Sequence, residues 1–133
     1  MAYGSVLTDT VQSSTAATAP VFKDGNGTQI GTLCRAWVNF NGTGTVAIRA
    51  SFNVSSITDN GTGDYTVNFT NAMPDVNYSD VYGCTSGAAG AAMPYIASGN
   101  YATYKTTTIL RFNIYTTGGA LQDPNSVSVA IFR

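Results

Sequence analysis

The sequence has 133 residues and a formal net charge of −1, and only 10% of its residues are charged while 44% are hydrophobic. This length fits a single domain with a substantial core. The low charge excludes a nucleic-acid-binding protein, because six scattered basic residues cannot neutralise a run of phosphates. All seven acidic residues are aspartate, which favours turns and caps over helix interiors, so we expect almost no α-helix.

Residues 1–20 carry isolated apolar residues and a run of Ser, Thr and Ala that ends at Pro20. Such a segment cannot bury enough surface to offset the entropy lost in ordering it. It is therefore either a frayed terminus or an extended arm laid along a partner, with contacts expected at Val6, Leu7 and Val11. We predict an extended attachment arm at 1–20 and a β-domain at 21–133.

Residues 34–52 predict a β-hairpin. Apolar residues alternate with other residues from position 34 to 40, the period of a pleated strand, and point Cys34, Ala36, Val38 and Phe40 inward. Asn41 and Gly42 supply a tight turn, after which the return run is predicted to point Val46, Ile48, Ala50 and Phe52 inward. A longer polar turn over 59–64 then precedes a third inward set, Tyr65, Val67 and Phe69.

The second half of the chain predicts three further strands. Asp80 interrupts the apolar stripe of residues 75–84, so we expect an edge strand with that face wet, or a bulge. The strands at 105–115 and 126–133 have the inward faces Thr108, Leu110, Phe112 and Ile114, and Val127, Val129 and Ile131. About seven strands separated by turn signals favour an all-β fold, an antiparallel β-sandwich that is jelly-roll-like.

Three stretches carry a family pattern, namely RAWVNFNGTGTVAIRASFNVSSI at 35–57, GDYTVNFTNAMPDVNYS at 63–79 and SVSVAIFR at 126–133. Trp37, the Asn-Gly turn, Arg49 and the Met73-Pro74 pair occur in one order and spacing. In these features the chain resembles a small β-domain that recurs in tail-fibre and related fibre proteins of tailed bacteriophages. The resemblance implies a location on the virion, assembly as a homotrimer, and attachment of the arm to other virion proteins.

Trp37 is predicted to lie on the strand face opposite Val38 and Phe40. Three interpretations stay open: it packs under a second layer of the sandwich, it lies in a subunit interface, or it is a sugar-stacking platform. Arg35 and Arg49 are expected on the same side, where an arginine either stacks on the indole or stays solvated. Trp37, Arg35 and Arg49 are therefore the interface candidates.

Tyr95, Tyr101 and Tyr104 lie in a stretch that also contains Ser, Asn and Gly. This composition is typical of adaptable binding loops, because a Tyr ring offers contact area at low entropy cost and a hydroxyl for sugars or peptides. Tyr is also a common strand residue. We predict these three tyrosines as receptor-binding residues.

The sequence contains no histidine, which excludes Ser-His-Asp and Cys-His catalysis and removes the commonest metal ligand. Asp59 and Asp64 flank one turn, where backbone capping explains them better than hydrolysis by paired carboxylates. We therefore expect no enzyme activity, no metal and no cofactor. The N-terminus lacks signal-peptide features, so we expect synthesis in the host cytoplasm and reduced thiols at Cys34 and Cys84.

Two functions from different classes follow. The first is a fibre or fibre-tip module, a homotrimer that presents its loops to a host surface glycan or protein. The second is a capsid or tail decoration or connector subunit with no receptor-binding role. Both place the protein on the virion, with no membrane insertion and no nucleic-acid partner.

Overall fold

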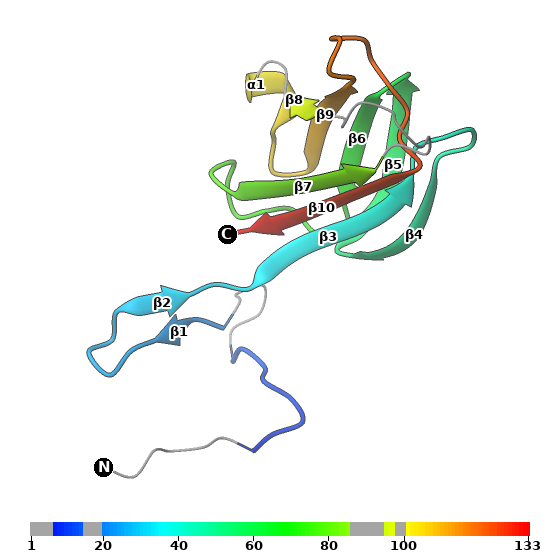
Figure 1. The fold of residues 1–133 in the computed structure, drawn as a ribbon. Coiled ribbons are helices and arrows are strands. Elements are labelled where there is room, and N and C mark those ends of the chain that lie inside the picture. The colour runs from blue at the N-terminus through cyan, green and yellow to red at the C-terminus, as the bar shows by residue number, and fades with distance from the viewer. Residues whose placement is uncertain (1–6, 15–19, 86–94, 98–100) are drawn as a thin grey trace. The chain divides into compact units, whose positions relative to one another are not determined.

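The computed structural model describes residues 7–14, 20–85, 95–97 and 101–133 (Figure 1). The chain divides into two compact units, Met1–Leu33 and Cys34–Arg133. The sequence placed the start of the β-domain earlier, at residue 21, but the two strands nearest to that position belong to the first unit. The role of residues 1–20 as an attachment arm stays a prediction.

The first unit contains a short hairpin in which β1 (Phe22–Lys23) pairs with β2 (Gln29–Gly31). Asp24 closes the turn between them, since its Oδ1 accepts hydrogen bonds from the backbone N–H groups of Asn26 and Thr28, both at 2.9 Å. This local capping is the reason an Asp-Gly-Asn-Gly stretch forms a tight turn.

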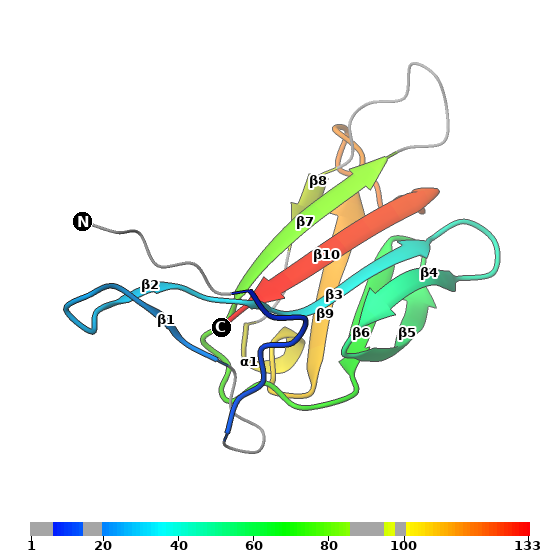
Figure 2. The ribbon, with the colours of Figure 1, turned by 90° about the horizontal axis from the view of Figure 1, so that it is seen from below.

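The second unit consists of two four-stranded antiparallel sheets with the orders β4-β3-β10-β7 and β5-β6-β9-β8 (Figure 1). Figure 2 shows β10 between β3 and β7. The elements are β3 (Cys34–Asn41), β4 (Ala47–Phe52), β5 (Val54–Gly61), β6 (Asp64–Phe69), β7 (Ser79–Thr85), β8 (Tyr95–Ala97), α1 (Tyr101–Tyr104), β9 (Ile109–Tyr115) and β10 (Ser126–Phe132). The predicted all-β antiparallel fold is confirmed. In the part of the chain with assigned structure, no helix is long and apolar enough to cross a membrane.

One hydrophobic core lies between the two sheets and comes mainly from their central strands. Phe40 of β3 packs against Tyr65 of β6 with ring centroids 5.2 Å apart, and Tyr82 of β7 packs against Phe112 of β9 at 5.0 Å. The packing is therefore sandwich-like. The predicted inward residues of the four central strands are buried, namely Ala36, Val38, Phe40, Tyr65, Val67, Phe69, Leu110, Phe112, Ile114, Val127, Val129 and Ile131.

Two of the residues predicted to face inward on these strands lie differently. Cys34 is half-buried at the start of β3, where its thiol donates a hydrogen bond to the carbonyl of Ala36. Thr108 is exposed, because it belongs to the turn that precedes β9. Neither Cys34 nor Cys84 takes part in a disulfide bond, in agreement with the predicted thiols.

The jelly-roll-like arrangement is wrong. β3 with β4, β5 with β6, and β8 with β9 pair as neighbours within one sheet. In a jelly roll, by contrast, most consecutive strands cross from one sheet to the other. The turn between β5 and β6, closed where Gly61 pairs with Asp64, is too short to cross and favours local pairing.

β4 departs from its predicted alternation at Arg49. Phe40 pairs with Ile48 and Asn39 pairs with Ala50, so Arg49 is the extra residue of a β-bulge. A bulge reverses the phase of a strand, because side chains alternate between the two faces with a period of two. Ala50 and Phe52, which were predicted to face the core, therefore face away from it.

The inward set predicted for β4 is confirmed at one position only. Val46 packs against the core, whereas Ile48, Ala50 and Phe52 are exposed. The bulge explains Ala50 and Phe52. Ile48 precedes the bulge on an edge strand, where little of the opposite sheet covers it.

β7 is an edge strand, as the interrupted apolar stripe predicted. Its pairing with β10 runs from Ser79 to Thr85 without a register shift, so the alternative explanation, a bulge, does not apply. Asp80 instead forms an ion pair with Lys105, and the two side chains are only 18% and 16% exposed. A charge on the inner side of the strand is tolerated because its partner is buried with it.

Candidate attachment surfaces

The sheet β5-β6-β9-β8 turns a polar face away from the core. The Asn68 amide Nδ2 donates hydrogen bonds to the hydroxyls of Ser56 at 3.1 Å and Thr58 at 2.9 Å, and the Asn60 Nδ2 donates to Thr66 at 2.9 Å. The strand register places the remaining members beside them on β6 and β9. We define the polar face as Ser56, Thr58, Asn60, Asp64, Asn68 and Arg111, together with Thr66 and Asn113, which are only 8% and 9% exposed.

Arg111 connects this polar face to α1. Its Nε and Nη2 donate to the two carboxylate oxygens of Asp64 at 2.8 and 2.6 Å, a bidentate pair. Its guanidinium carbon lies 4.7 Å from the ring centroid of Tyr104, the last residue of α1. The Tyr104 ring thus lies beside the amide and hydroxyl groups of the polar face. This combination of groups suits a polar ligand.

The charges of this pair reinforce each other. The hydrogen bonds and positive charge of Arg111 hold the pKa of Asp64 below its ordinary value, with smaller contributions from the amides of Asn60 and Asn113. In return, the hydrogen-bonded carboxylate of Asp64 raises the pKa of Arg111. Both groups are therefore charged at neutral pH.

A pH dependence of stability follows from the lowered pKa of Asp64. The unfolded chain binds a proton at this carboxyl near pH ~3.9, whereas the folded protein binds it only at lower pH. The stabilisation is therefore complete above the unfolded pKa and is lost as the pH falls through the folded one. We expect the free energy of unfolding, measured in urea between about pH 5 and pH 2, to fall less steeply for Asp64→Asn than for the wild type. An equally steep fall in the free energy of unfolding for the two proteins would contradict a stabilising role of the Asp64 carboxylate.

The three predicted receptor-binding tyrosines lie on two elements that both contact β9. The backbone of Tyr95, at the start of β8, pairs with Tyr115 of β9, and Tyr101 begins α1. The side chains of Tyr95 and Tyr101 lie outside what the structure describes. The Tyr104 ring lies against the Arg111 guanidinium.

Asp64 and Arg111 were not predicted from the sequence as members of a surface site. A usable signal existed, because each residue is a direct neighbour of an inward-facing aromatic residue, Tyr65 or Phe112, on a strand of alternating pattern. Such neighbours point to the opposite face of their sheet. Their pairing with each other required the register between β6 and β9.

The other sheet turns an apolar row away from the core. Phe52 pairs with Trp37, Trp37 pairs with Ala130, and Ala130 pairs with Val81, so one line of side chains crosses all four strands. Phe52, Trp37 and Val81 are 56%, 39% and 55% exposed. Adjacent exposed apolar side chains are typical of protein interaction sites. These four residues are the apolar row, and Trp37 therefore does not belong to the buried core.

Arg35 lies on the same strand as Trp37, and Arg49 lies on the neighbouring strand β4. Each arginine is at an irregularity in the strand pairing. The register shift between β3 and β10 leaves Arg35 without a paired residue. Arg49 donates hydrogen bonds to the carbonyl oxygens of Phe40 at 3.2 Å and Asn125 at 2.5 Å. Among the described residues, cation–π contacts occur on Tyr78 and Tyr104 and not on Trp37. Arg49 thus fastens the β3–β4 hairpin to the loop before β10, and the interface role of both arginines stays a prediction.

The predicted contact points of the arm are described in part. Leu7 is 96% exposed and Val11 is 67% exposed. Val6 lies outside the described residues. Both described side chains are therefore accessible to a partner, and their role in attachment stays a prediction.

Comparisons with known proteins add one finding. No protein-family model and no curated protein matches the sequence. The fold is similar to part of the phiAB6 tailspike, whose crystal structure is of a complex with three-repeated oligosaccharides of Acinetobacter baumannii surface polysaccharide. The TM-score is 0.53 and the sequence identity is 18%, and the match covers 96% of this chain and 30% of the tailspike chain. The likeness is therefore one of fold, and this chain spans less than a third of the tailspike that it matches.

Proposed function

We propose that the chain is a virion protein of a tailed bacteriophage, a fibre or fibre-tip module that attaches the particle to the host surface. The likeness of its fold to part of a tailspike, over 96% of the chain, is the observation that carries this proposal. The sequence resemblance to phage fibre domains supports it independently. The module is non-catalytic and uses no cofactor or metal.

The two outer faces of the sandwich suit two different tasks. The polar face, with Tyr104 stacked on Arg111, offers hydroxyl, amide and aromatic groups to a host surface glycan or protein. The apolar row offers Trp37 and Phe52 to another copy of the chain, in a homotrimer. The exposed Leu7 and Val11 are available for other virion proteins.

Adsorption of the phage to its propagating host tests the receptor-binding role. A phage that carries Tyr95→Ser, Tyr101→Ser and Tyr104→Ser is expected to assemble normally and to adsorb at least about tenfold more slowly, because aromatic residues carry much of the energy of recognition surfaces. The matched control replaces the same tyrosines with Phe, which keeps the rings and removes the hydroxyls. Normal adsorption of the triple Ser phage would contradict the proposal.

A second function, a capsid or tail decoration or connector subunit, is favoured by the exposed Leu7 and Val11. Under this alternative, a protein that lacks residues 2–20 is absent from purified particles, while the triple Ser phage adsorbs normally. Loss from particles together with slow adsorption of the Ser phage supports the attachment module instead, since that module also needs a tether.

A further inference from the structure

The turn between α1 and β9 is held by hydrogen bonds within the turn and by further hydrogen bonds from outside it. Thr106 closes it, because its N–H donates to the carbonyl of Ile109 at 3.0 Å and its Oγ1 accepts from the N–H groups of Thr108 and Ile109. The turn is also held from outside, where the N–H of Met73 donates to the carbonyl of Thr107 at 2.7 Å. The N–H of Phe69, the last residue of β6, also donates to the carbonyl of Thr108 at 2.9 Å, so backbone hydrogen bonds fix the position of the turn relative to the end of β6.

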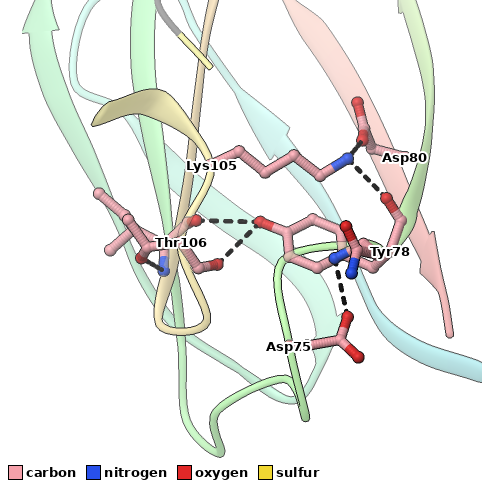
Figure 3. Close-up of polar contacts among 7 residues, drawn as sticks. Asp75, Tyr78, Asp80, Lys105 and Thr106 are labelled. Carbon is pink, nitrogen blue, oxygen red and sulfur yellow. Dashed lines mark hydrogen bonds and ion pairs between the residues drawn. The ribbon is translucent and has the colours of Figure 1, made fainter. Parts of the chain in front are cut away.

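A cluster of side chains fastens the same turn to the opposite sheet (Figure 3). Lys105, the residue after α1, donates from Nζ to the Asp80 carboxylate and to the carbonyl of Tyr78 at 2.5 Å. The Nζ also lies 4.4 Å from the centroid of the Tyr78 ring. The Tyr78 hydroxyl reaches back to the carbonyls of Thr106 at 3.0 Å and Ile109 at 3.1 Å. We define the Lys105 cluster as Tyr78, Asp80, Lys105 and Thr106.

The cluster lies on the core side of the edge strand, at the base of the helix that carries Tyr104. Tyr78 is 2% exposed, and the side chains of Lys105 and Asp80 are 16% and 18% exposed. Replacing a buried ion pair with apolar residues of similar size is often neutral or stabilising. Stability alone therefore gives little reason for a lysine at this position. The Lys105 ammonium group, however, contacts the Asp80 carboxylate, the Tyr78 carbonyl and the Tyr78 ring at the same time. These three contacts fix the position of the chain after α1.

We propose that Lys105, Asp80 and Tyr78 are positioning residues for the recognition surface, which they serve by holding α1 where Tyr104 stacks on Arg111. This inference rests on the proposed attachment function, but its structural part can be tested without a receptor. The turn couples the two sites directly, because Lys105 follows Tyr104 in the chain and forms a β-bridge with Leu110, which precedes Arg111. A displaced Lys105 must therefore move Tyr104.

The decisive variant removes both charges, Lys105→Met with Asp80→Leu, because this change leaves no unpaired charge in the core. We expect it to keep its global stability in urea within experimental scatter. Its amide exchange should be about tenfold faster at Thr106 and Met73 and unchanged in β3 and β10. Its Arg111 Nε–H resonance should shift toward the position seen in Tyr104→Ser, which lacks the ring. Tyr78→Phe, which loses only the two hydroxyl contacts, should shift the resonance part of the way.

The matched control is Arg133→Met, which breaks the exposed ion pair between Arg133 and Asp75 and should change neither readout. Unchanged exchange at Thr106 and an unchanged Arg111 resonance in the double variant would overturn the proposal. Phage adsorption distinguishes failure of the positioning role from failure of the attachment function. If the resonance shifts as expected but Tyr104→Ser phage adsorbs normally, the positioning stands and the attachment function fails. If Tyr104→Ser slows adsorption and the double variant does not, the cluster has no positioning role in recognition.

Discussion

Gly63→Ala is expected to lower the free energy of unfolding by about 3 kcal/mol or more, of which about 1–2 kcal/mol comes from backbone strain. Gly63 has a φ of +64°, and a Cβ there would lie 2.6 Å from the carbonyl oxygen of Ile114 and 2.8 Å from the nitrogen of Gln122. Those backbone atoms cannot move aside, because the two residues are hydrogen-bonded to each other at 3.0 Å. Denaturation in urea measures the loss.

The same substitution should also disturb the polar face. The Gly63 N–H donates to Asp123 at 2.6 Å, and the Asp123 carboxylate accepts from the Tyr65 hydroxyl at 2.7 Å. Asp64 is the next residue, so a displaced turn moves its carboxylate away from Arg111. The Arg111 Nε–H resonance should therefore shift in Gly63→Ala even under conditions where the protein remains folded.

Gly44→Ala is the matched control for this prediction. Gly44 has almost the same backbone conformation, with a φ of +63°, but no heavy atom lies within 4 Å of its Cβ position. Only the conformational cost of about 1–2 kcal/mol is expected there. An equal loss in the two variants would show that strain, and not the contact with residues 114 and 122, accounts for the effect.

The central strands could be predicted from the sequence because each is covered on one face by the opposite sheet. Ala36, Val38 and Phe40 in β3 and Leu110, Phe112 and Ile114 in β9 alternate without interruption and are all buried. An edge strand lacks this constraint. β5 contains Ser55, Ser56, Thr58, Asp59 and Asn60, and the sequence predicted a polar turn over its last part. Little of β5 is covered, so its composition carries no signal of a strand.

The remaining errors and omissions depend on pairings between distant residues. The bulge at Arg49 is a property of the register between β3 and β4, and the same sequence in a regular ladder would point Phe52 inward. Asp80 indicated an irregularity, but its partner Lys105 is 25 residues away in the chain, between α1 and β9. The polar face could be predicted strand by strand, whereas the contact of Tyr104 with Arg111 could not, because a four-residue helix brings them together.

Trp37→Ser combined with Phe52→Ser is expected to convert a trimer in solution into a monomer. The two side chains are neighbours in the register, belong to the apolar row and are 39% and 56% exposed in the single chain. Truncation of an aromatic residue at the centre of an interface costs about 2 kcal/mol or more, so two such changes weaken association by about three orders of magnitude. Light scattering of the purified chain measures the change in mass.

The fold of the subunit should survive this change, because neither side chain belongs to the core between the sheets. Leu121→Ser is the control, since Leu121 is 44% exposed but lies outside the apolar row, and this variant should keep the mass of the wild type. A wild-type chain that is monomeric with and without residues 1–20 would contradict self-assembly altogether, and would support a subunit that is held in place only by the particle. A double variant that remains trimeric would instead show that the copies meet elsewhere. In that case the apolar row would be open to another virion protein, and the same two substitutions should then reduce the amount of this subunit on purified particles.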